Sequence, residues 1–141
     1  EVNAIALERN EGLWTPKPEP AWTYDLEGEV WASPVVTGDF AILANWTKDA
    51  TGCLRCVSVA TGDDRWSVQL EGQVTASPIV SSNVVYAVSE LGELIGVDLQ
   101  SGRVLWRESL PGGVQGTPLV MNGGALYVPI MDGTVRCYRA G

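Results

Sequence analysis

Histidine is absent from this chain of 141 residues. The imidazole ring is the usual base of Ser/His/Asp and Cys/His nucleophilic sites and a frequent metal ligand, so the chain alone excludes such sites. Cysteine is scarce as well, with three residues and no Cys-Cys dipeptide. This odd number does not indicate a disulfide scaffold, and the redox compartment stays open.

Basic residues and long apolar runs are also few. Nine Lys and Arg stand against 17 Asp and Glu, which leaves a formal net charge of -8. Nucleic acids and anionic membranes bind clustered positive charge, and a bilayer is crossed by roughly 20 consecutive apolar residues. The sequence has neither feature, so we expect no nucleic-acid partner and no direct membrane insertion.

What the sequence does contain is repetition. The phrase "EGEVWASPVV" at 27–36 returns as "EGQVTASPIV" at 71–80 and as "PGGVQGTPLV" at 111–120, after steps of 44 and 40 residues. A period of about 40 residues is typical of β-propeller blades. The four additional residues of the first period lie between Pro34 and Gly52, where we expect a lengthened hairpin turn.

Each period divides into four short apolar stretches separated by turn residues, which is the pattern of a four-stranded blade. In the second period these stretches are 74–80, 84–88, 93–99 and 104–110. Frequent Gly, Pro and β-branched residues interrupt any helical period. We therefore predict an all-β fold, a β-propeller segment of about three four-stranded antiparallel blades without long helices. The predicted domains are an N-terminal remnant strand and Pro-rich linker (1–20) and three repeats within 21–141 (approximately 22–66, 67–106 and 107–141).

Burial differs between the predicted strands. "FAILA" at 40–44 is continuously apolar, which favours a strand buried on both faces. In contrast, Trp66, Val68 and Leu70 alternate with polar residues, as in a half-buried outer strand.

A second phrase follows each first one and carries a family resemblance. "CVSVATGDDRW" at 56–66 and "GVDLQSGRVLW" at 96–106 are similar to A-x-D-x-x-T-G-x-x-x-W, the tryptophan-docking motif of PQQ-like β-propeller repeats. The resemblance implies that the glycine forms a tight turn and that the indole lies between neighbouring blades with its N–H bonded to the backbone. It assigns this structural role to Gly62, Trp66, Asp98, Gly102 and Trp106.

The N-terminus contains a weaker copy of this motif. The segment 4–14 has the same ten-residue interval, with Asn10 in place of the glycine, but Trp22 rather than Trp14 is in step with the repeats. The prolines between the two tryptophans oppose regular strand pairing. Either an insertion separates Trp14 from Trp22, or the N-terminal residues are a stiff linker.

Three blades do not close a ring, because closed propellers have about four to eight. Unpaired edges and apolar blade faces favour association. We therefore expect either a piece of a larger propeller or a homodimer of six blades, in which the strand at 22–26 of one copy completes the third blade of the other. The chain begins at Glu1, so we also expect a processed form or a part of a longer protein.

Cys53 and Cys56 form a C-x-x-C pair, but on a strand the positions i and i+3 point to opposite faces. We therefore predict structural or free thiols. Cys56 and Cys137 hold the same place in the first and third repeats, and we expect them to share similar interior surroundings.

Two function classes remain. The quinoprotein dehydrogenases of the PQQ-like family hold pyrroloquinoline quinone and calcium with an adjacent cysteine pair and an aspartate base, and we match none of these to this sequence. We therefore expect no enzyme, no catalytic residue, no metal site and no PQQ or calcium cofactor. The alternative is a fragment of such a dehydrogenase, with the site in other blades. Asp98 and Asp132 are interpreted as turn acceptors. The resemblance to the outer-membrane assembly lipoprotein and to sensor regions of bacterial serine/threonine kinases implies an extracytoplasmic scaffold or ligand-sensing module. Its partner is a protein or a small ligand.

The candidate binding positions are those that vary inside the repeated phrase, after the turn from an outer to an inner strand. Trp31 stands out, because Thr and Gln occupy its place in the other repeats. It is interpreted either as a binding anchor or as a filler of a wider loop. The six candidates are Glu29, Trp31, Gln73, Thr75, Gly113 and Gln115.

Overall fold

The computed structural model describes residues 1–115 and 120–139, in which every regular element is a β-strand. Two sheets have four strands each and run in the orders β5-β6-β7-β8 and β12-β11-β10-β9. A third sheet has the order β13-β14-β15, and β1 pairs with β4 and β2 with β3. All pairs are antiparallel, which confirms the predicted all-β fold.

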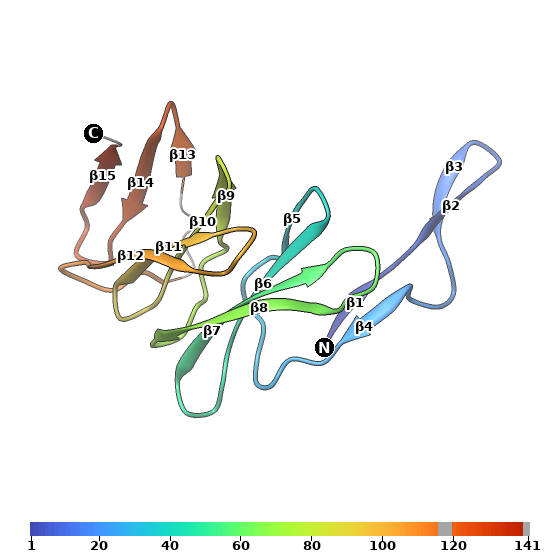
Figure 1. Cartoon of the computed structure of the whole chain (residues 1–141), viewed down its shortest axis with the longest axis horizontal. Coiled ribbons are helices and arrows are strands. Elements are labelled where there is room, and N and C mark those ends of the chain that lie inside the picture. Colours follow the sequence, from blue (N-terminus) through green and yellow to red (C-terminus); the bar gives the residue numbers. More distant parts are fainter. Residues whose placement is uncertain (116–119, 140–141) are drawn as a thin grey trace.

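The sheets follow one another in chain order, from the β2–β3 hairpin at the right of Figure 1 to β13–β15 at its left. The strands preceding the first four-stranded sheet are β1 (Val2–Ala4), β2 (Leu7–Asn10), β3 (Leu13–Pro16) and β4 (Trp22–Tyr24). The first sheet contains β5 (Val35–Thr37), β6 (Phe40–Trp46), β7 (Thr51–Ser58) and β8 (Asp64–Glu71). The second contains β9 (Ile79–Ser81), β10 (Val84–Val88), β11 (Glu93–Asp98) and β12 (Val104–Ser109). The third contains β13 (Val120–Asn122), β14 (Ala125–Pro129) and β15 (Val135–Arg139).

The core consists of apolar layers between consecutive sheets. Along β6, Ile42 and Ala44 face the second sheet, whereas Ala41 and Leu43 face the β1–β4 pair. Successive side chains of a strand point to opposite faces, so a strand that packs on both sides must be apolar at every position. This explains why the 40–44 stretch shows no polar alternation, and the prediction of a doubly buried strand is confirmed.

The predicted outer strand has the expected alternation. In β8, Val68 and Leu70 are buried while Ser67 and Gln69 are exposed. The four additional residues of the first repeat, however, do not lengthen the turn. Strands β6 and β7 have 7 and 8 residues, against 5 and 6 in β10 and β11, and both hairpins turn through four residues. The prediction of a longer turn is therefore wrong, because cross-strand pairing extends through the extra residues.

Tryptophans join consecutive sheets. The Trp66 indole N–H donates to the carbonyl of Leu99 at 2.8 Å, and that of Trp22 donates to the carbonyl of Val59 at 2.7 Å. Gly102 and Gly62 lie against the two indoles with φ of 74° and 77°. A Cβ on either glycine would collide with the ring, so glycine is required both for the left-handed turn and for the close approach.

The N-terminal residues contain an insertion. Ala4 pairs with Trp22 in the same way that Cys56 pairs with Trp66, so Trp22 occupies the tryptophan position of the docking motif. The β2–β3 hairpin lies between Ala4 and Trp22, and the side chain of Trp14 on it is 67% exposed. The structure therefore has an insertion, as one of the two alternatives stated, but it lies between Ala4 and Trp22 and contains Trp14, so the copy at 4–14 is not a docking motif.

Strand donation between copies does not agree with this arrangement. In the single chain β4 is already paired with β1, and Trp22 is bonded to the first four-stranded sheet of its own chain. Leu26 is buried in the same apolar layer. The prediction that 22–26 completes the third blade of a second copy is therefore wrong for this form of the chain.

We predict that Gly102→Ala lowers the free energy of unfolding by about 2–4 kcal/mol, because the new methyl group clashes with Trp66 in addition to the strain of positive φ. Gly123→Ala is the matched control: its φ is 58°, but nothing lies within 4 Å of the added Cβ. It should cost only about 1 kcal/mol. Urea unfolding followed by tryptophan fluorescence measures both. Equal losses would show that Gly102 is required only for its backbone conformation.

Candidate functional site

The six predicted positions lie where the repeated phrase meets the hairpin turns of the sheets. Glu29 and Trp46 exchange two main-chain hydrogen bonds of 3.0 and 3.1 Å at the end of β6. In the next repeats the N–H of Glu90 donates to the carbonyl of Gln73, and that of Met131 to the carbonyl of Gly113, at 2.7 and 2.9 Å. The three phrases therefore border the β6–β7, β10–β11 and β14–β15 turns, and we call this region the turn end.

Two residues of the first phrase form an exposed, hydrogen-bonded pair at the turn end. Trp31 is 66% exposed, and its indole N–H donates to Oε2 of Glu29 at 2.9 Å. The main chain beneath them is held firmly, because the buried Asn45 amide donates to the carbonyl of Glu27 at 2.6 Å. Trp31 therefore does not fill an interior gap, and the filler interpretation is wrong for this structure.

The other four positions differ in accessibility. Thr75 is only 7% exposed and is not available to a partner in this form. Gly113 lies so close to the carbonyl of Glu90 that a side chain would collide with it. Gln73 is half-buried, and the exposed Gln115 donates from its amide to Oε1 of Glu90 at 3.2 Å. The structure therefore brings Gln73, Gly113 and Gln115 together around Glu90, and it leaves Glu29 and Trp31 as the accessible pair.

Sequence reasoning missed two exposed apolar residues at the turn end. Leu91 is 71% and Met131 67% exposed, and they lie in the β10–β11 and β14–β15 turns. Leu91 packs against Gly72, and the Met131 main chain bonds to Gly113. Their signal in the sequence was an apolar residue directly beside the Gly or Asp of a hairpin turn, where polar residues are usual.

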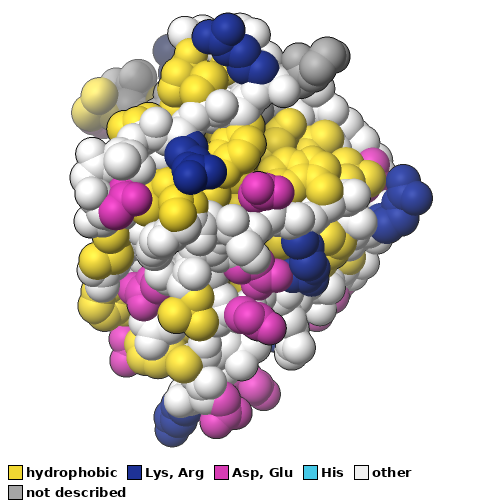
Figure 2. Space-filling model, turned by 90° about the vertical axis from the view of Figure 1, so that its left-hand side faces the viewer, with side chains coloured by type: hydrophobic (Ala, Val, Ile, Leu, Met, Phe, Trp, Pro, Cys, Tyr) yellow, Lys and Arg dark blue, Asp and Glu magenta, His cyan; other side chains and the backbone are white. Residues whose placement is uncertain are grey.

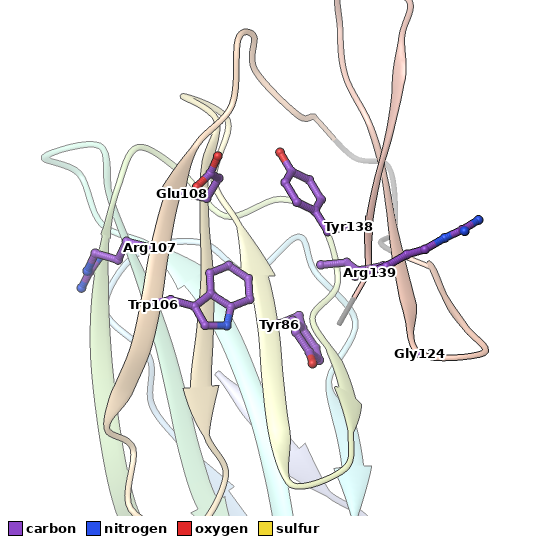
Figure 3. A pocket seen from close by; sticks show the side chains of 8 residues that line it. Tyr86, Trp106, Arg107, Glu108, Gly124, Tyr138 and Arg139 are labelled. Carbon is purple, nitrogen blue, oxygen red and sulfur yellow. The ribbon is translucent and has the colours of Figure 1, made fainter. Parts of the chain in front are cut away.

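A second candidate is a cavity of about 350 Å³ between the second and third sheets (Figure 3). Trp106 and Tyr86, whose ring centroids are 6.0 Å apart, face Tyr138 across it, while the Arg139 side chain extends away. Leu126 completes the apolar lining. The same side of the molecule, shown in Figure 2, carries hydrophobic side chains between acidic and basic ones.

This cavity corresponds to the places where Trp22 and Trp66 are covered. Trp106 pairs with Gly96 as Trp66 pairs with Cys56, but its indole N–H makes no hydrogen bond within the described residues and 39% of the side chain is exposed. The position equivalent to Val59 and Leu99 is residue 140, which lies outside the described residues. The repetition of the fold is therefore sufficient to explain the cavity. Thr117 and Pro118 of the third phrase lie outside the described residues as well.

The carboxylates predicted as turn acceptors have this role. Oδ1 of Asp98 accepts from the backbone N–H of Ser101 and Gln100 and from the Ser101 hydroxyl, at 2.8 to 3.1 Å. The hydrogen bonds from Ser101 lower the pKa of Asp98. Asp132 accepts in the same way from Thr134, which lowers the pKa of Asp132. The interpretation as turn acceptors is confirmed.

The thiols of the C-x-x-C pair lie on different sides of β7. Cys56 belongs to the apolar layer between the two four-stranded sheets. Cys53 interacts with Arg55, whose guanidinium donates to the hydroxyl of Tyr24 on β4. The prediction of free, diverging thiols is confirmed. Cys137 is exposed rather than buried, so the prediction of matching surroundings for Cys56 and Cys137 is wrong. That prediction assumed a neighbouring sheet on both faces of β15.

The part of the chain that the structure describes contains neither a metal-binding cluster nor a membrane-spanning helix. Within 1–115 and 120–139, no group of three or more Cys, Asp or Glu is placed so that it could hold a metal ion. In the same ranges, no helix is long and apolar enough to cross a membrane.

Comparison with known proteins identifies the family. Residues 50–140, well over half of the chain, match the PQQ-like family described as outer membrane protein assembly factor BamB. The chain belongs to the PQQ-like β-propeller repeat family. It is also 40% identical over 122 residues to the DNA damage-responsive serine/threonine-protein kinase RqkA of Deinococcus radiodurans. That match covers 85% of this chain and 14% of the kinase, so the chain spans only a small part of this relative.

Solved structures show that the PQQ-like repeats have the propeller fold. BamB from Moraxella catarrhalis superposes with a TM-score of 0.70 at 21% identity, over 86% of this chain and 37% of that one. The computationally designed Ika4 protein superposes with a TM-score of 0.64 at 19% identity, over 77% of this chain and 64% of its own. At 21% and 19% identity, these superpositions show a shared fold and not a shared function.

We predict that the three thiols react very differently with a disulfide reagent at pH 7.5. Burial raises the pKa of Cys56 to about 11 and also raises the pKa of Cys53, so both remain thiols, and their side chains are shielded. Cys137 is exposed and should react within minutes. Absorbance of the released aromatic thiol counts the reactive groups, one in the native chain and three in guanidinium chloride. The Cys137→Ser variant is the control and should show none before unfolding.

Proposed function

We propose that this chain is part of a β-propeller module that binds another protein through the turn end and does not catalyse a reaction. The observation that carries this proposal is the accessible pair Trp31 and Glu29, together with exposed Leu91 and Met131 on turns fixed by main-chain hydrogen bonds. Exposed aromatic and apolar side chains on a rigid frame are typical of protein interfaces. Fold alone would not carry this assignment, because one fold serves many functions.

The relatives support a recognition role and not a particular partner. One has a name that describes assembly in the outer membrane, and the other a name that describes a kinase. A propeller that binds a partner is compatible with both. We further propose an extracytoplasmic location, in line with the assembly factor, and association of the chain with further propeller sheets, from a longer protein or from a second copy, over the Trp106 cavity.

The proposal is tested by comparing capture of partners by three forms of the protein. Trp31→Ala/Leu91→Ala/Met131→Ala should lose the proteins that the unaltered chain retains from extracts of the source cells, whereas Leu13→Ala/Trp14→Ala on the β2–β3 hairpin should retain them. Quantitative mass spectrometry measures retention. The altered residues are exposed, so the thermal midpoint of each form should stay within about 3 °C of the unaltered chain. Undiminished capture by the triple variant contradicts a role of the turn end.

A second candidate function is ligand sensing in a serine/threonine kinase, which the 40% identity to RqkA favours. In that case the propeller would bind a ligand and transmit its presence to a kinase domain elsewhere in the protein. A quinone site of the dehydrogenase kind does not fit the residues of this chain, because Cys53 and Cys56 diverge across β7 and no Cys-Cys dipeptide exists.

We therefore expect that pyrroloquinoline quinone with calcium does not stabilise this chain. A ligand at 100 times its dissociation constant would stabilise the folded state by about 2.7 kcal/mol, which for a chain of this size is a readily measured rise in thermal midpoint. Differential scanning fluorimetry with quinone alone, calcium alone and both together should give no rise above buffer. A rise that requires both components would contradict the non-enzymatic assignment.

A further inference from the structure

In the pair formed by Glu29 and Trp31, one carboxylate oxygen of Glu29 has no hydrogen bond from the described residues. The indole N–H of Trp31 occupies Oε2 of Glu29 at 2.9 Å, whereas Oε1 accepts no hydrogen bond from the described residues. Glu29 makes no ion pair within those residues either. The exposed carboxylate of Glu29 is therefore hydrogen-bonded to an indole through one oxygen, and its other oxygen can still accept a hydrogen bond.

The pair is held in place by its backbone. Glu29 is fixed to Trp46 by two main-chain hydrogen bonds, and Gly28 lies against the carbonyl of Trp46 with φ of 93°, an approach that no other residue permits. Equivalent phrases in the second and third repeats carry Gln73 with Thr75 and Gly113 with Gln115, and neither combines an aromatic ring with a carboxylate. The pair is thus a feature of the first repeat and not of the repeated scaffold.

We propose, resting on the proposed function of the turn end, that Trp31 and Glu29 together bind an arginine side chain of the partner protein. A guanidinium is planar, donates hydrogen bonds to a carboxylate and stacks on an indole. Here the carboxylate and the indole are joined by one hydrogen bond, so a single guanidinium could contact both. The net charge of -8 favours the approach of a basic segment over an acidic one. Leu91 and Met131 would then contact the apolar residues that surround such an arginine.

The experiment uses the full chain labelled with ¹⁵N and two probe peptides, acetyl-Gly-Arg-Gly-amide and the same peptide with citrulline in place of arginine. Citrulline has nearly the same shape and no charge. The indole N–H signal of Trp31, assigned by its loss in Trp31→Phe, should shift saturably with the arginine peptide, with a dissociation constant on the order of millimolar. Citrulline should bind at least roughly fivefold more weakly.

Trp14 is the internal control, because its side chain is as exposed as that of Trp31. Its indole signal should move little. Glu29→Gln should weaken binding of the arginine peptide roughly threefold to tenfold. Raising the salt from 50 to 500 mM reduces the electrostatic screening length to below about 5 Å, so it should weaken this binding as well.

Equal shifts of the Trp14 and Trp31 signals, equal binding of the citrulline peptide, or unchanged binding by Glu29→Gln would each overturn the arginine site. Failure here is distinguishable from failure of the proposed function. If the turn-end triple variant loses its captured proteins while the arginine peptide does not bind, the turn end stands as an interface and only the arginine assignment falls. If the arginine peptide binds and the triple variant still captures the same proteins, the arginine site stands and the turn end is not the interface for those proteins.

Discussion

The structure depends on one constraint, which is that each central sheet must bury both of its faces. β6 directs Ile42 toward the second sheet and Leu43 toward the β1–β4 pair, and both side chains are at most 1% exposed. Burial of large aliphatic side chains contributes about 1.5–3 kcal/mol each, so a sheet without its neighbours would lose much of its stability. The sheets are therefore stable only as a stack, and the tryptophan contacts with Gly62 and Gly102 set the spacing within it.

This constraint decides where the chain can bind anything. The sheet faces are occupied by packing, so accessible variation is confined to the ends of strands and to the outer sheets. At the turn end, Glu29 and Trp31 emerge from a main chain that is bonded to Trp46 on β6. The cavity beside Trp106 and Tyr86 differs from the turn end, because its geometry repeats that around the covered tryptophans Trp22 and Trp66. Stacking of sheets is sufficient to explain it.

Much of the fold was predictable because its signals are local. A period of about 40 residues, four apolar stretches in each, and turn glycines follow from what one strand or one turn requires. The predictions that failed concerned how the strands pair and which side chains are buried. The extra residues of the first repeat lengthened β6 and β7 rather than the turn, Cys137 proved to be exposed, and Thr75 proved to be buried. Pairing register and burial depend on neighbours that are distant in the chain.

By itself, the sequence determined the all-β class, the repeat, the absence of histidine chemistry and the residues that make each turn, since composition and local periodicity are properties of the chain. Only the tertiary structure decided which varied positions reach the surface. Glu29, Trp31, Gln73, Thr75 and Gly113 look alike as variable letters. Yet Thr75 is buried, Gln73 is half-buried, Gly113 lies too close to a carbonyl for a side chain, and Glu29 and Trp31 are exposed and hydrogen-bonded to each other. The physical reason is that exposure is set by the hairpin turn that contacts each phrase, and this turn lies 17 or 18 residues further along the chain.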